Sequence, residues 1–112
     1  MSDLKSAIAS LVKFRDERNW QQFHNSKDLA LALSIEAAEL NELFLWKNSE
    51  EAENVNQEKL REELADVFAY ALLLAEKHGL DVSEIVLDKI KKNGEKYPID
   101  KAWNLSKKYN EL

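Results

Sequence analysis

The sequence predicts an all-α fold, an antiparallel helical bundle of four main helices plus a short C-terminal segment. Apolar residues recur at helical spacing along most of the 112 residues, and alternating strand-like runs are missing. Only two glycines and one proline interrupt the chain, which argues against a loop-rich protein. The connections are short, so consecutive helices are expected to be antiparallel neighbours. With no internal repeat and no sign of a boundary, residues 1–112 are expected to form a single domain.

The first half of the chain contains two of the expected helices. Residues 4–18 are expected to form the first, because their apolar side chains are spaced for one face. A connector over residues 19–27 follows, in which Asn25 and Ser26 are both suitable N-caps for the next helix. That second helix is expected to run from about Lys27 to Lys47.

The second half begins with a polar, acidic loop over residues 48–56. Asn56 can cap the third helix, which is expected to run to about His78 and to stop at Gly79, a usual helix terminator. The fourth is expected over residues 82–94, after an Asp-x-x-Glu sequence suited to helix capping. The remaining residues, 95–112, form a short amphipathic segment.

Composition excludes several classes of protein. The 21 acidic residues exceed the 16 basic ones, giving a net charge of −5, which is unfavourable for binding nucleic-acid polymers or anionic membranes. The absence of cysteine excludes disulfides, thiolate metal sites and a thiol nucleophile. The longest apolar run, Val67–Ala75, is far shorter than the ~20 residues of a membrane-spanning helix. We expect a soluble, cytoplasmic protein.

Four carboxylates stand on the apolar faces of the second and third helices. Glu36 and Glu39 form an i, i+3 pair on one helix, and Glu63 and Asp66 form a matching pair on the other. Antiparallel packing brings both pairs to one level. Burying an unpaired ionised carboxylate costs several kcal/mol, and the central positions of these faces offer no Lys or Arg. Oxygen ligands without His or Cys favour Mg²⁺ or Mn²⁺ as the compensating cation.

The same acids have other interpretations. A single Glu on an apolar face is more often a partly exposed, salt-bridged residue. The chain could also be a non-catalytic helical module, such as a regulatory or adaptor homodimer, that binds a metal or nucleotide as a signal. A third alternative is a structural dimer whose buried acids pair with lysines of the partner chain. The repetition of the pair on two neighbouring helices favours the metal site.

The two carboxylate motifs resemble the metal motif of the MazG-like all-α nucleoside triphosphate pyrophosphohydrolases. The similarity covers about residues 15–112. The Trp20–His24 segment, the 39–46 and 66–70 runs, and Lys96-Tyr97-Pro98 are similar to the dCTP pyrophosphatase branch. One position departs from that branch, because Leu11 stands where a histidine near the base can occur. This departure bears on the base preference and leaves the chemistry unchanged.

The resemblance implies a Mg²⁺-dependent enzyme that converts a (deoxy)nucleoside triphosphate and water to the monophosphate and diphosphate, favouring dCTP or a related pyrimidine deoxynucleotide. It also implies assembly as a homodimer or homotetramer. The implied catalytic and metal residues are Glu36, Glu39, Glu63 and Asp66, with Glu36 or Glu39 as the candidate general base. The implied base and sugar contacts are Trp20, Gln21, Gln22, Phe23, His24, Trp46 and Tyr70.

Basic residues are concentrated late in the chain. From Asp88 onward there are seven lysines and four acids. Four residues have spacings that suit phosphate binding by the same or a neighbouring subunit: Lys89, Lys92, Asn93 and Lys96. A solvated basic face accounts for the same pattern equally well.

Overall fold

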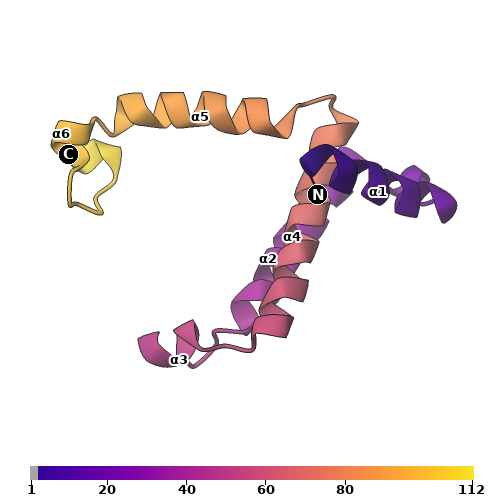
Figure 1. Ribbon diagram of the computed structural model, residues 1–112, viewed down its shortest axis with the longest axis horizontal. Coiled ribbons are helices and arrows are strands. Elements are labelled where there is room, and N and C mark those ends of the chain that lie inside the picture. Colours follow the sequence, from indigo (N-terminus) through magenta and orange to yellow (C-terminus); the bar gives the residue numbers. More distant parts are fainter. Residues whose placement is uncertain (1–2) are drawn as a thin grey trace. The chain divides into compact units, whose positions relative to one another are not determined.

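The computed structural model describes residues 3–112, and this part of the chain contains helices and no strand (Figure 1). The all-α prediction is therefore confirmed. The chain divides into two compact units, one ending at Gly79 and the other comprising Leu80–Leu112. The single domain expected over the whole chain stays a prediction. No helix in the described range is both long and apolar enough to cross a membrane.

The first unit contains four α-helices and a 3₁₀ turn among its described residues: α1 (Leu4–Glu17), η1 (Gln21–Phe23), α2 (Ser26–Glu42), α3 (Ser49–Glu53) and α4 (Gln57–Lys77). The described part of the second unit contains three short or medium elements: α5 (Val82–Lys96), α6 (Ile99–Ala102) and η2 (Tyr109–Glu111).

Side-chain caps fix where the long helices begin. Asn25, one of two expected candidates, caps α2 by accepting a hydrogen bond from the Asp28 amide. Asn56 and Asp81 cap α4 and α5 in the same way. These caps satisfy amides that the first helical turn leaves without partners. At the other end of α4, Gly79 adopts φ 63°, a conformation that glycine reaches without a Cβ clash. The predicted starts and this stop are confirmed.

Two predicted helix ends are wrong. The second helix stops at Glu42 instead of Lys47, and a new helix, α3, forms inside the predicted loop. Asn48 caps α3 through a capping box with Glu51, and this cap has extended backbone angles. After Glu42 the amides of residues 43–45 bond to carbonyls three residues back instead of four, so the α-helical pattern has ended. Trp46, in the intervening turn, takes a left-handed φ of 63°.

The fourth predicted helix was expected to end at Asn93-Gly94, but α5 continues to Lys96. A glycine inside a helix costs ~1 kcal/mol and does not by itself end it. Pro98 supplies the stop, since a proline disfavours helical backbone in the residue before it. Tyr97 accordingly has a non-helical ψ of 68°.

Packing in the first unit centres on α4. Helices α2 and α4 run antiparallel alongside each other, and α1 also packs against α4 (Figure 1). The buried apolar residues are Leu29, Val55, Leu72, Leu73 and Ala75. The antiparallel pair that positions the carboxylates is thus present. The arrangement of four helices in one bundle stays a prediction, because α5 belongs to the second unit.

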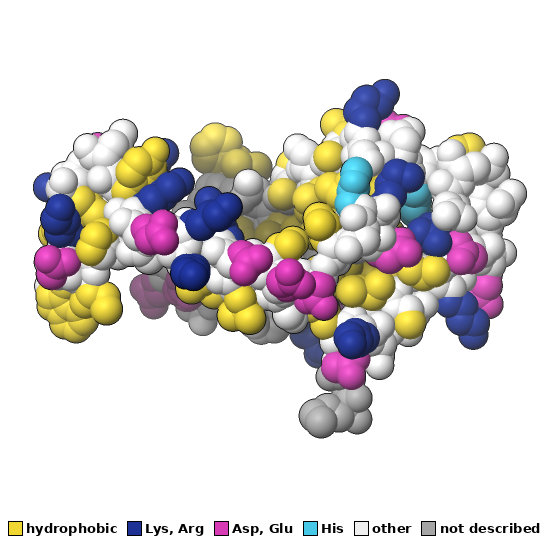
Figure 2. Space-filling model, turned by 90° about the horizontal axis from the view of Figure 1, so that it is seen from above, with side chains coloured by type: hydrophobic (Ala, Val, Ile, Leu, Met, Phe, Trp, Pro, Cys, Tyr) yellow, Lys and Arg dark blue, Asp and Glu magenta, His cyan; other side chains and the backbone are white. Residues whose placement is uncertain are grey.

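Many large apolar side chains lie at the surface, and Figure 2 shows several of them among charged groups. Leu31 and Ile35 on α2 and Phe68 on α4 are more than half exposed. On α5, Leu87 and Ile90 are exposed to a similar degree. Extensive exposed apolar surface is typical of chains that associate with other protein surfaces.

Candidate metal centre and nucleotide pocket

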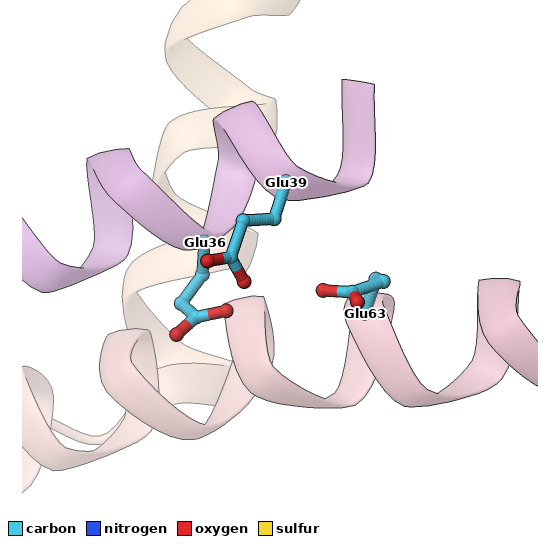
Figure 3. Close-up of side chains that lie close together, drawn as sticks. All are labelled: Glu36, Glu39 and Glu63. Atoms are coloured by element: carbon cyan, nitrogen blue, oxygen red, sulfur yellow. The ribbon is translucent and has the colours of Figure 1, made fainter. Parts of the chain in front are cut away.

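Three of the four predicted carboxylates meet between α2 and α4. One oxygen each from Glu36, Glu39 and Glu63 lies within 4.8 Å of the other two (Figure 3). The i, i+3 spacing places the two α2 carboxylates one turn apart on the same face. Antiparallel packing against α4 then brings Glu63 opposite them.

This cluster is electrostatically uncompensated within the described part of the chain. The Oε2 atoms of Glu36 and Glu63 are buried and have no hydrogen-bond partner there. A hydrogen bond shared with Glu39, burial, and the neighbouring carboxylate charges raise the pKa of Glu36 to about 7. Burial and the charges of Glu39 and Asp66 also raise the pKa of Glu63. A divalent cation with oxygen ligands would satisfy these orphaned atoms.

Asp66, the fourth predicted carboxylate, lies one turn further along α4. It is not one of the three that converge, but its charge contributes to raising the pKa of both Glu36 and Glu63. Asp66 also lines a cavity of about 270 Å³ in the first unit. It therefore joins the carboxylate cluster to this pocket.

The pocket lies against α1 and α4 and the connector after α1. Trp20, His24 and Tyr70, three of the predicted base and sugar contacts, line it. Burial and the charges of Glu36 and Asp66 raise the pKa of Tyr70, so its hydroxyl stays protonated. The other lining residues are Leu11, Phe14, Arg15, Ala69 and Leu73, besides Asp66.

Aromatic packing holds Trp20 in place just after the C-terminal end of α1. Its ring makes an edge-to-face contact with Phe14, with centroids 5.8 Å apart. The Arg18 guanidinium lies 3.6 Å from the Phe14 ring centroid and donates a hydrogen bond to the Phe14 carbonyl. Such contacts orient a large aromatic side chain. The pocket thus has a flat apolar wall.

Other predicted contacts do not line this pocket. Gln21 lines a neighbouring cavity of about 160 Å³ that shares Arg15 and His24 with this pocket, and the Gln22 side chain donates to the Asn19 carbonyl. Phe23 and Trp46 are 62% and 92% exposed. Their contact with a nucleotide stays a prediction.

The predicted phosphate contacts lie on α5, in the second unit. They share one helical face and are exposed: Lys89, Lys92, Asn93 and Lys96. The Lys96 ammonium lies 4.9 Å from the Tyr109 ring centroid, so this side chain already has a cation–π partner. Their role with phosphates also stays a prediction.

The structure adds Arg15 and Phe14 to the residues expected near a ligand. Their spacing places both on the same face of the first helix as Leu11, but the sequence does not predict them as pocket residues. The sequence gives one indication for Arg15. It is a charged residue on an apolar helix face, and such a side chain requires partners once it is buried. Leu11, the position singled out in the sequence for its departure from the similar proteins, also lines this pocket.

Comparison with known proteins identifies a family and a similar fold. The model of the MazG-like family matches residues 31–112. Human dCTP pyrophosphatase 1 is 40% identical over 106 residues, covering 90% of this chain, and the protein of that name from Mus musculus is 36% identical. The chain spans 62% of the length of these relatives. A crystal structure of a pyrophosphatase from Archaeoglobus fulgidus is 37% identical, with a TM-score of 0.82, covering 88% of this chain and 94% of that one.

Proposed function

Since this chain belongs to the MazG-like family, we propose that it is a nucleoside triphosphate pyrophosphatase. It would convert a (deoxy)nucleoside triphosphate and water to the monophosphate and diphosphate. The main support for the proposal is that Glu36, Glu39 and Glu63 converge between α2 and α4. Asp66, one turn further along α4, lines the adjacent pocket. The names of its relatives, dCTP pyrophosphatase 1 and a pyrophosphatase, support the same reaction class.

Glu36, Glu39, Glu63 and Asp66 would hold Mg²⁺, or Mn²⁺ in its place. The donor set fits, because it consists of carboxylate oxygens, two of which are buried without partners. When bound, such a cation neutralises the triphosphate and stabilises the charge that develops on the phosphoryl oxygens. The residues themselves fix its position by projecting from two packed helices.

A water molecule attacks the α-phosphorus, the bond to the bridging oxygen breaks, and diphosphate leaves. One carboxylate of the cluster accepts the proton of that water. Glu36 and Glu39, which lie one turn apart in the cluster, are the candidates. Tyr70, whose pKa is raised, supplies a hydroxyl donor at the border between cluster and pocket.

We infer a preference for dCTP or a related pyrimidine deoxynucleotide. The relatives named dCTP pyrophosphatase 1 support this preference, and the cavity of about 270 Å³ has room for a base. Trp20 offers a face for stacking, which is worth ~1–3 kcal/mol per base.

We further propose that the chain works as a homodimer or homotetramer in the cytoplasm, with both units in one functional domain. The exposed apolar side chains of α2 and α4 support association. The family match extends across both units. In this assembly Lys89, Lys92, Asn93 and Lys96 of the same or a neighbouring subunit would bind the phosphates.

The test is to incubate the purified chain with Mg²⁺ and dCTP in ¹⁸O-labelled water and to separate the products by chromatography. The expected products are diphosphate and dCMP carrying the label, because attack occurs at the α-phosphorus. Release of orthophosphate with dCDP would contradict the proposal. A nucleotide that binds with Mg²⁺ yet survives the incubation would instead support the non-catalytic module.

A matched pair of variants links this activity to the cluster. Glu63→Gln removes a charge from the cluster and should abolish turnover, whereas Glu53→Gln makes the same change at an exposed position of α3 and should leave it intact. Circular dichroism of both variants verifies that the helices are retained. A fully active Glu63→Gln variant would remove this residue from the site.

A further inference from the structure

Arg15 is the one buried charged side chain among residues 3–112, at 7% exposure. Its Nε donates to Asp16 Oδ1 at 2.9 Å, and its Nη1 donates to Glu76 Oε2 at 3.3 Å. A guanidinium carries five N–H donors, and these two bonds use two of them. The remaining donors belong to Nη1 and Nη2, and the side chain lines both the pocket that borders Asp66 and the neighbouring cavity that Glu76 lines.

The ion pairs alone do not explain why Arg15 is buried. The side chains of Asp16 and Glu76 are 50% and 37% exposed, so either acid could pair with an arginine at the surface. Burying the guanidinium adds a desolvation cost that a surface pair avoids. A ligand that accepts hydrogen bonds from Arg15 inside the cavity would account for the burial of this side chain.

His24 faces the same pocket next to Arg15. Its Nδ1 is buried and has no hydrogen-bond partner in the described residues. Burial and the charge of Arg15 lower the pKa of His24, so the ring is neutral at pH 7 and one of its nitrogens is an acceptor. The pocket therefore offers donors from Arg15 and an acceptor from His24 between largely apolar walls.

We propose that Arg15 determines base specificity by donating hydrogen bonds to the edge of the nucleobase in this pocket. This inference rests on the proposed function. Cytosine has the matching pattern. Its O2 and N3 are adjacent acceptors for Arg15, and its exocyclic amino group can donate a hydrogen bond to the His24 ring. Thymine and uracil carry a hydrogen on N3, which would point at a donor-only guanidinium. A site that leaves polar groups unpaired rejects the wrong ligand strongly.

The first measurement is the ratio of kcat/KM for dCTP to that for dTTP. We expect Arg15→Gln to lower kcat/KM for dCTP by roughly 10- to 100-fold, the range for loss of a base-edge contact, and that for dTTP by less than about threefold. The matched control is Glu76→Gln, which removes the charge that pairs with Arg15 across α1 and α4. It should change the ratio by less than about threefold. Equal losses for both nucleotides in Arg15→Gln would overturn the proposal.

A binding measurement separates this inference from the proposed function. Binding of dCMP and dTMP without metal can be followed through tryptophan fluorescence in a chain in which Trp46 and Trp103 are replaced by phenylalanine, leaving Trp20 in the pocket as the probe. With Arg15 in place this chain should bind dCMP more tightly than dTMP, and Arg15→Gln should lose that preference even if no triphosphate is hydrolysed. Equal affinities with Arg15 in place would refute base reading by Arg15.

Arg15→Lys provides a second test in case Arg15→Gln does not fold. Lysine keeps the charge but loses the planar fork of donors, so the preference for dCMP should fall while helicity is retained. A lysine variant with undiminished preference would show that charge alone, and not the guanidinium edge, sets the specificity.

Discussion

Glu36 makes the metal-free protein less stable as the pH rises. Its pKa lies at about 7 in the folded chain against an ordinary value of 4.5, so the folded state holds the proton more tightly than the unfolded state does. The stability from this group is fully present below pH 4.5 and is lost as the pH rises through about 7. The Glu36→Gln variant has no proton to lose at this position and should escape that loss.

The magnitude follows from the size of the pKa difference. Roughly 2.5 pH units at ~1.36 kcal/mol each correspond to ~3 kcal/mol. Because the Glu36 side chain is only partly buried, solvent screening reduces the expected effect to roughly 1–2 kcal/mol. Glu36→Gln should therefore be more stable than the unmodified chain by roughly 1–2 kcal/mol at pH 8 and nearly equal to it at pH 4.

Urea denaturation in the presence of EDTA, followed by tryptophan fluorescence at several pH values, measures this difference. The control is Glu53→Gln, whose difference from the unmodified chain should not vary with pH. The reasoning would be refuted if the free energies of unfolding of Glu36→Gln and the unmodified chain differed by the same amount at every pH from 4 to 8. Catalytic activity should nevertheless be lost in Glu36→Gln, so stability and function would change in opposite directions.

Other predictions concern the cluster, the pocket and a helix cap. Mg²⁺ at 100 times its dissociation constant should stabilise the unmodified chain by ~2.7 kcal/mol, measurable as a raised Tm, and Glu63→Gln should show little of this effect. The apparent Mg²⁺ affinity, measured by calorimetry, should fall about tenfold per pH unit below pH 7, because a proton on Glu36 competes with the metal. Trp20→Ala should weaken dCMP binding by ~1–3 kcal/mol, as followed by calorimetry. Asn48→Ala should cost ~1 kcal/mol of unfolding free energy without altering the base preference, as denaturation and kinetics would show.

The features predictable from sequence are those that local geometry determines. The i, i+3 spacing and the short connection between two helices were enough to predict that Glu36, Glu39 and Glu63 meet. Cap residues identified the starts of α2, α4 and α5, because capping depends on a few neighbouring groups. The orphaned oxygens within the cluster show that the carboxylates were worth singling out.

The features that sequence reasoning missed depend on competition between local helix signals or on contacts between helices. Helix α3 begins at the Asn48–Glu51 capping box, which lies within the stretch predicted as a loop. Trp46 was placed on that helix and lies in an exposed turn instead. The place of Arg15 in the pocket follows from packing between α1 and α4, which periodicity on one helix does not describe.

In its described part, the first unit compensates its buried guanidinium but not its partly buried carboxylates, and this difference would orient a ligand. Arg15 is neutralised by Asp16 and Glu76 within the chain. The carboxylates of Glu36 and Glu63 have no such partner among the described residues. The pocket therefore borders uncompensated negative charge through Asp66 and directed donors at Arg15. A nucleotide has matching ends, since its phosphates need a cation and its base can accept hydrogen bonds. In the proposed complex the phosphates therefore lie at the carboxylates, and the base edge lies at Arg15.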